Sequence, residues 1–154
     1  MKNLGTLLII GLLNFGALGL GGLLMDGGPT SDWYMALQKA PWTPAGWVFG
    51  AAWTLIMFCF TIYMTRLWYA SNRSKSVLFL FAIQWVLNVM WNPVFFKFHL
   101  MLIGLVIILM LTALVIKFLF GYWRILKLES LWILPYALWL LVATSLNAYI
   151  YFYN

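Results

Sequence analysis

The stretch WYMALQKAPWTPAGWVFGAAW, from Trp33 to Trp53, stands where a polar connector between two apolar segments would be expected. It holds four of the chain's ten tryptophans, two prolines and a single charged residue, Lys39. Proline lacks an amide N–H and restricts the residue before it, so Pro41 and Pro44 disfavour a regular helix. We therefore predict that the part from Trp33 to Trp47 is a partly structured loop. The segments on either side of it indicate the fold.

The composition places the chain in lipid. Hydrophobic residues make up 66% of the 154 positions and charged residues only 8%, whereas a soluble domain is about half apolar and about a quarter charged. The net charge of +6 does not indicate a nucleic-acid partner, because the basic residues are scattered and form no basic run. The single cysteine excludes an internal disulfide and a cysteine-based zinc site.

Five uncharged apolar windows divide the chain. A helix that spans a bilayer needs about 20 mostly apolar residues, with a range of about 17–25, and all five windows fit. The strands of a membrane barrel would instead alternate in polarity over about ten residues. We expect an all-α integral membrane protein in which residues 1–154 form a single domain, a bundle of five transmembrane helices. The windows are 4–24, 45–65, 76–96, 100–116 and 130–154.

The basic residues predict the orientation of the bundle, because short cytoplasmic loops carry an excess of lysine and arginine. The side that holds the N-terminus carries Lys2, Arg66, Arg73, Lys75, Lys117, Arg124 and Lys127, whereas the other side carries only Lys39 and Lys97. We expect a cytoplasmic N-terminus, an outward-facing C-terminus and an outward-facing loop at 33–47. A bacterial cell membrane is the expected location.

Three polar residues inside the third window, Gln84, Asn88 and Asn92, are spaced by four and share a helical face with Trp91. Amides inside a membrane bundle usually form hydrogen bonds between helices. The same stripe would suit the wall of a ligand cavity. The two interpretations are compatible, and both remain open at this stage.

The second and fifth windows present aromatic faces. Gly46, Phe49 and Gly50 lie within about 60° of Trp53 at about 100° per residue. Either a neighbouring helix packs closely against these glycines or the space beside them holds a ligand. In the fifth window, one face carries Trp132, Tyr136, Trp139, Ala143 and Asn147.

The first window is rich in small residues. Ala17 and Gly21 form a small-xxx-small pair, which allows close approach of another helix within the chain or between protomers. A homodimer that forms through this face is one interpretation of the pair.

The polar residues outside these faces exclude several chemistries. The only acidic residues, Asp26, Asp32 and Glu129, lie outside the windows, so a pair of carboxylates for acid–base hydrolysis is not expected. The single histidine, His99, makes no recognised metal-ligand spacing with the two aspartates, and we expect no metal site. The absence of charge inside the windows also argues against ion-coupled transport. A transporter of small lipids or metabolites remains an alternative.

Four clusters of residues, spread over most of the chain, form a specific pattern. They are Trp33-Tyr34-x-x-Leu37-x-Lys39-x-Pro41-Trp42-x-Pro44, Trp47-Val48-Phe49-Gly50-x-x-Trp53-Thr54, Gln84-x-x-Leu87-Asn88-x-x-Trp91-Asn92-Pro93-x-Phe95-Phe96 and Leu134-Pro135-Tyr136-x-Leu138-Trp139 with Ala143-Thr144-x-Leu146-Asn147. With these clusters the chain resembles the TspO/MBR family, the tryptophan-rich sensory proteins related to the mitochondrial translocator protein, or peripheral benzodiazepine receptor.

The resemblance implies a five-helix bundle, a homodimer, and a first connector folded as a lid over a cavity. It implies binding of porphyrins such as protoporphyrin IX, and also of isoquinoline or benzodiazepine compounds. Some bacterial members promote light-dependent porphyrin degradation, and by motif the two tryptophans associated with that photochemistry are Trp53 and Trp139. No obligatory cofactor is expected, because the porphyrin would be the ligand or the substrate. A drug-type ligand-binding protein without catalysis is the other alternative.

The motifs and the helical faces together predict a ligand-binding set. Its members are Trp33, Lys39, Trp42, Phe49, Trp53, Gln84, Asn88, Trp91, Tyr136, Trp139, Ala143 and Asn147. Aromatic rings can stack on a flat porphyrin, amides and indole N–H groups can meet its polar edges, and Lys39 can pair with a propionate. Because the windows contain no histidine, a metal-free tetrapyrrole is favoured over ligated haem.

This chain departs from the family pattern at several positions. The proline of the Lys39-Ala40-Pro41-Trp42 motif stands one place later than in the family, and Met57 replaces a frequent tyrosine. The fourth window contains no carboxylate, although the family often has an aspartate there. No basic residue follows Lys127, so the C-terminal sterol motif of the mammalian members is absent.

Overall fold

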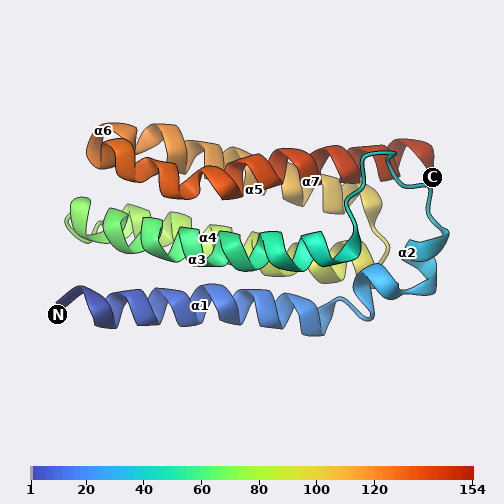
Figure 1. Ribbon diagram of the computed structural model, residues 1–154, viewed down its shortest axis with the longest axis horizontal. Coiled ribbons are helices and arrows are strands. Elements are labelled where there is room, and N and C mark those ends of the chain that lie inside the picture. The colour runs from blue at the N-terminus through green and yellow to red at the C-terminus, as the bar shows by residue number, and fades with distance from the viewer. Residues whose placement is uncertain (1) are drawn as a thin grey trace.

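The computed structural model describes residues 2–154, and the side chains from Leu4 onward. The long helices run along one axis of the molecule (Figure 1). They are α1 (Lys2–Leu24), α3 (Gly46–Ala70), α4 (Lys75–Asn92), α5 (Met101–Gly121) and α7 (Leu134–Tyr153). The described residues form no strand, and five helical segments are long and apolar enough to cross a membrane. The predicted all-α fold of five spanning helices is confirmed.

The helix ends differ from the apolar windows, because a charge near the end of a helix can reach the membrane interface without breaking the backbone. Thus α3 continues past Arg66 to Ala70, and α5 continues past Lys117 to Gly121. The window 130–154 begins instead as a 3-10 helix, η3 (Lys127–Ile133), which follows the short α6 (Trp123–Leu126), and α7 starts only at Leu134.

A π-helical turn, η2 (Pro93–Lys97), closes the third span. Pro93 has no N–H to donate to the carbonyl of Val89. The Asn92 side chain donates to that carbonyl, at 3.5 Å, and to the carbonyl of Asn88, at 3.1 Å. One residue of the predicted polar stripe therefore supports the backbone of its own helix.

An aromatic cluster forms the core in the half of the bundle nearest the N-terminus. Phe60 of α3 is fully buried and packs its ring against Tyr63, Phe81, Phe118 and Tyr136, at centroid distances of 5.3–6.2 Å. These rings come from α3, α4, α5 and α7, so one aromatic cluster joins four helices. A core of this kind holds the other half of the same helices in place.

The small face of α1 packs within the chain. Ala17 is buried, and a Cβ on Gly21 would lie 2.5 Å from the side-chain nitrogen of Asn92 in α4. Nearby, Asn14 donates a hydrogen bond of 2.9 Å to Thr61 of α3. At Gly21 this face packs on α4 within the chain, and a homodimer stays a prediction.

The connector between α1 and α3 folds across one end of the bundle, the end that also holds the C-terminus (Figure 1). It contains η1 (Gly28–Thr30) and α2 (Asp32–Ala36), followed by an irregular stretch up to Gly46. We call residues 25–45 the lid. Gln38 and Asn154 exchange two hydrogen bonds, of 2.8 and 3.2 Å, which tie the lid to the end of α7.

Candidate functional site

A cavity of about 350 Å³ lies beneath the lid, between α1, α3, α4 and α7. None of its lining residues is a lysine, arginine, histidine, aspartate or glutamate. The lining consists of Ala17, Leu18, Gly22, Met25, Pro29, Tyr34, Gly46, Phe49, Gly50, Trp53, Thr54, Asn88, Trp91, Asn92, Phe95, Phe96, Trp139, Ala143, Leu146, Asn147 and Ile150. The site is therefore apolar and aromatic, with a few neutral polar groups.

Aromatic rings from α3 and α7 form one wall. Phe49 meets Trp139 edge to face, at a centroid distance of 5.4 Å, and Trp53 meets Tyr136 in the same way at 6.0 Å. Edge-to-face pairs hold their rings at defined angles. This wall is therefore preorganised, with two indoles at the cavity surface.

The facing wall comes from α4 and η2. Trp91 stacks on Phe95 at 5.4 Å and donates its indole N–H to Asn147 of α7, at 3.2 Å. The Asn147 side chain in turn donates to the carbonyl of Ala143, at 2.9 Å. The hydrogen bond between Trp91 and Asn147 joins α4 to α7 across the cavity, and so serves the structural role expected of buried polar groups in membrane helices.

Polar groups of the lining residues Asn88 and Trp139 have no partner among the described residues. The side-chain amide of Asn88 makes no hydrogen bond to residues 4–154, although Asn88 is buried. The indole nitrogen of Trp139 is also buried without a hydrogen bond in that part of the chain. Buried polar groups normally find partners. The Asn88 amide at the cavity wall is therefore a candidate contact for a ligand atom or water, whereas the Trp139 indole nitrogen is closed off by its neighbours in this structure.

Gly46 and Gly50 settle the question that the second window raised. A Cβ added to either glycine would meet no atom within 4 Å. No helix packs closely there, in contrast to Gly21, and both glycines line the cavity. Both glycines are exposed, so the space beside them is open and they form an edge of the cavity.

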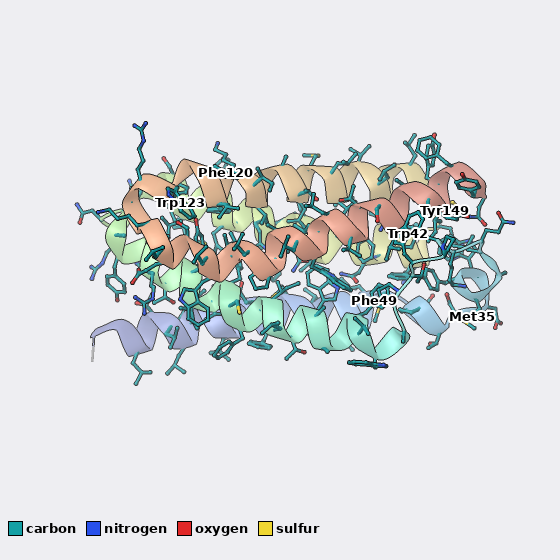
Figure 2. All side chains as sticks on the ribbon, turned by 45° about the horizontal axis from the view of Figure 1, so that its top comes forward. Met35, Trp42, Phe49, Phe120, Trp123 and Tyr149 are labelled. Atoms are coloured by element: carbon teal, nitrogen blue, oxygen red, sulfur yellow. The ribbon has the colours of Figure 1, made fainter. Side chains whose placement is uncertain are left out.

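The predicted lid residues Trp33, Lys39 and Trp42 do not line the cavity. Trp33 stacks on His99, at a centroid distance of 4.1 Å, and Trp42 donates to Ser145 of α7 at 3.1 Å. Figure 2 shows Trp42 beside Tyr149 at the end of α7, and their rings meet edge to face at 5.6 Å. The two tryptophans thus fasten the lid from outside.

Lys39 holds the lid through its own neighbours. Its ammonium donates to the carbonyls of Met35 and Leu37, at 3.1 and 3.5 Å, and lies 5.0 Å from the centre of the Tyr34 ring. Tyr34 reaches the cavity from the lid, and burial raises the pKa of its hydroxyl above the ordinary value. The lid thus contributes a neutral phenol to the site, and its lysine lies outside.

Gln84 and Tyr136 lie below the cavity. The Gln84 amide donates to the Tyr136 hydroxyl at 2.8 Å, and each residue is only 1% exposed. Neither lines the cavity. Seven of the twelve predicted ligand-binding residues line it, namely Phe49, Trp53, Asn88, Trp91, Trp139, Ala143 and Asn147, and these include both predicted photochemical tryptophans.

Sequence reasoning missed the wall contributed by α1, which includes Ala17, Leu18 and Gly22. These residues are small or aliphatic, and nothing in their pattern distinguishes them from residues that face lipid. It also left Asn92 and Phe96 out of the set, although both belong to a quoted motif and Asn92 follows Asn88 by four. Their spacing was the signal that could have found them.

Comparison with known proteins places this site in a family. The model of the TspO/MBR family matches residues 9–153. The chain belongs to the TspO/MBR family. Tryptophan-rich protein TspO of Archaeoglobus fulgidus is 34% identical over 151 residues, 96% of this chain and 96% of that protein. Protein CrtK of Rhodobacter capsulatus is 31% identical over 118 residues, 75% of this chain and 74% of that protein.

The similarity extends to eukaryotes. The translocator protein of Homo sapiens is 28% identical over 119 residues, which cover 75% of this chain and 70% of the human protein. The family resemblance inferred from the four clusters is confirmed, and the chain is an integral membrane protein of a family of tryptophan-rich sensory and translocator proteins. Within this TspO/MBR chain the fourth span, α5, contributes no residue to the cavity and Met57 is fully buried outside it. Neither of these departures from the family pattern changes the lining.

Proposed function

We propose that this protein is a membrane receptor or sensor that binds porphyrins of the protoporphyrin IX type in the cavity beneath the lid. The supporting observation is a cavity whose facing walls are aromatic and whose polar lining groups, such as the Asn88 amide, are neutral. A free-base porphyrin is a flat aromatic plate with an apolar body. Ring stacking and single hydrogen bonds are the interactions such a plate can make.

The donor set of the cavity favours a metal-free porphyrin. The lining contains no histidine or cysteine, and its only methionine is Met25. Met57, Met64 and Met90, which lie within the spans, are not part of the lining. Axial ligands of haem iron are usually histidine, cysteine or methionine side chains. We therefore expect this protein to have little preference for haem over metal-free porphyrin.

A tetrapyrrole needs more room than the cavity beneath the lid offers as it stands. The cavity volume of about 350 Å³ lies near the lower end of the range of about 300–1,000 Å³ for sites that hold drug-sized ligands. Isoquinoline or benzodiazepine compounds match this volume as it stands. A porphyrin, which is wider, requires displacement of the lid or extension of the plate past the open glycine edge at Gly46 and Gly50.

Titration of the purified protein with protoporphyrin IX in the dark, followed by tryptophan fluorescence, tests this proposal. Trp53→Phe and Trp139→Phe each remove ring area and an indole N–H, at a cost of about 1 kcal/mol each. The double variant should bind roughly thirtyfold more weakly. Trp47→Phe is the control, because Trp47 is 76% exposed and does not line the cavity. Unchanged affinity in the double variant would rule out this pocket.

A second candidate is light-dependent breakdown of the bound porphyrin. It is favoured by the position of Trp53 and Trp139, two oxidisable side chains at the surface of one cavity. Light would excite the porphyrin and dioxygen would be the oxidant. Addition of one dioxygen molecule across a bridging carbon–carbon double bond, followed by its cleavage to two carbonyls, uses every atom and requires no acid or base from the protein.

Illumination of the complex at saturating porphyrin separates breakdown from binding. The porphyrin absorption band should fade in air, persist under argon, and fade more slowly in the double tryptophan variant. Equal rates of bleaching in the wild-type complex, in the double variant and in free porphyrin solution would contradict this second candidate and leave binding as the proposed function.

We further propose a bacterial cell membrane, a cytoplasmic N-terminus and a homodimer. The orientation rests on the excess of basic residues at the end of the bundle opposite the lid, and reporter fusions to each terminus measure it. Gly21 packs on Asn92 of α4 within the chain, so we expect a dimer to form through another face. Cysteine cross-linking through exposed positions of α1 and α4 distinguishes the faces that remain.

A further inference from the structure

A second hollow lies at the end of the bundle opposite the lid. It is a groove of about 610 Å³ between the first turns of α1, the last turns of α3 and the 3-10 segment η3. We call it the Arg66 groove. Its lining is Leu4, Leu7, Ile62, Thr65, Arg66, Tyr69, Glu129 and Trp132. None of these residues lines the cavity beneath the lid.

The groove combines apolar walls with one pair of opposite charges. An Nη1 group of Arg66 contacts Oε1 of Glu129, and both side chains are about half exposed, at 48% and 45%. Within residues 4–154, neither side chain makes another polar contact, so the remaining guanidinium N–H groups and the second carboxylate oxygen are open. An amphiphile with an apolar tail and a polar head fits such a surface.

The floor of the groove is held in place by its neighbours. The Tyr69 hydroxyl shares a hydrogen bond of 2.7 Å with Thr6 of α1, and the guanidinium of Arg73 lies 5.6 Å from the centre of the Tyr69 ring. Trp132, which is 39% exposed, forms part of the opposite wall. Tryptophan is enriched where a membrane meets water, so the wall that contains Trp132 is expected at the depth of the lipid headgroups.

The charges of the groove differ from those of the surface around it. This end of the bundle carries Arg73, Lys75, Lys117, Arg124 and Lys127 beside the groove residues, and Glu129 is its single acidic residue. A basic belt alone attracts any anionic lipid. Inside the groove, however, a purely anionic headgroup would have to approach the Glu129 carboxylate. A headgroup with both a phosphate and a primary ammonium matches Arg66 and Glu129 together.

We propose that the Arg66 groove binds a phospholipid with an ethanolamine headgroup. The phosphate accepts hydrogen bonds from Arg66, the ammonium donates to Glu129, and an acyl chain lies along Leu4, Leu7 and Ile62. This site is independent of the porphyrin cavity. Bound lipid would contact α1, α3 and η3 at the end of the bundle opposite the lid.

Quenching by brominated lipid tests the proposal. The full-length protein is reconstituted in phosphatidylcholine vesicles that contain an equal fraction of brominated phosphatidylethanolamine, phosphatidylglycerol or phosphatidylcholine. The signal of Trp132 is obtained as the difference between the wild type and Trp132→Phe. We expect the ethanolamine lipid to quench Trp132 most strongly.

Substitutions then identify the headgroup contacts. Arg66→Gln and Glu129→Gln should each reduce the ethanolamine preference by about tenfold, because each removes a hydrogen bond to a charged group. Lys75→Gln is the matched control, since Lys75 lies at the same end outside the groove, and should leave the preference unchanged. Circular dichroism and elution profiles confirm that each variant folds, and the comparison of lipids with wild-type protein stands even if a variant does not.

Three results would overturn the proposal. Strongest quenching by phosphatidylglycerol would show that the basic belt selects the lipid and that Glu129 has no part. Equal quenching by all three lipids would show that the groove is ordinary lipid-facing surface. Protection of Trp132 from all three, together with dimers cross-linked at this end, would show that a second copy of the chain covers the groove.

Discussion

Gly50 offers the sharpest test of the cavity, because a side chain there has room. A Cβ at this position would meet no atom within 4 Å, and the residue lines the cavity between Phe49 and Trp53. Gly50 is exposed at the edge of this cavity of about 350 Å³, and Gly50→Leu adds four carbon atoms at that edge. The substitution should not destabilise the protein, because leucine is a better helix former than glycine by about 1 kcal/mol.

The expected loss of affinity follows from the ligand atoms that the new side chain excludes. A drug-sized ligand gains about 0.3 kcal/mol of binding free energy per non-hydrogen atom. Exclusion of four atoms therefore costs about 1.2 kcal/mol, which is about an eightfold weaker Kd. The assay is a dark titration with protoporphyrin IX beside a thermal unfolding curve. Affinity should fall while the unfolding midpoint stays the same or rises.

Gly16→Leu is the matched control for this substitution. Gly16 also has no atom within 4 Å of its would-be Cβ, but it lies on α1 outside the cavity. This variant should bind as the wild type does. If Gly50→Leu also bound protoporphyrin IX with wild-type affinity, the ligand would not occupy the cavity beneath the lid.

Two further predictions concern packing and the lid. Gly21→Ala should lower the free energy of unfolding by about 1–3 kcal/mol, because its Cβ would displace the Asn92 amide that donates to the carbonyls of Asn88 and Val89. Thermal unfolding measures this change. Gly19→Ala, with nothing within 4 Å, should not lower the midpoint, because alanine is the better helix former. Equal midpoints for the two variants would refute the close contact between α1 and α4. Asn154→Ala removes both hydrogen bonds to Gln38, each contributing about 1 kcal/mol, so amide hydrogens of the lid should exchange faster. Unchanged exchange would mean that other contacts hold the lid.

Much of the architecture could be predicted from hydropathy and spacing. Five apolar windows gave five helices, since a lipid-exposed backbone must satisfy its hydrogen bonds within each segment. The faces of Phe49 with Trp53, and of Asn88 with Trp91, both reached the cavity. Those predictions succeeded because residue spacing determines the angle of a side chain around its own helix.

Spacing could not separate ligand contacts from lid fasteners. Trp33 and Trp42 lie in the same motif as Tyr34, yet only Tyr34 lines the cavity, whereas the two tryptophans pack against His99 and Tyr149. In an irregular segment no fixed period relates residue number to direction. Side chains a few residues apart can therefore serve opposite faces of the lid.

The sequence by itself determined that this protein lies in a lipid bilayer, and it determined its helices, its family and the aromatic character of its first connector. The tertiary structure alone decided what each small residue does. Gly21 and Gly50 are the same residue in the same kind of helix, yet one touches Asn92 and the other borders empty space. The reason is physical: sequence spacing sets the direction of a side chain, but the distance to whatever lies in that direction depends on how the neighbouring helices pack.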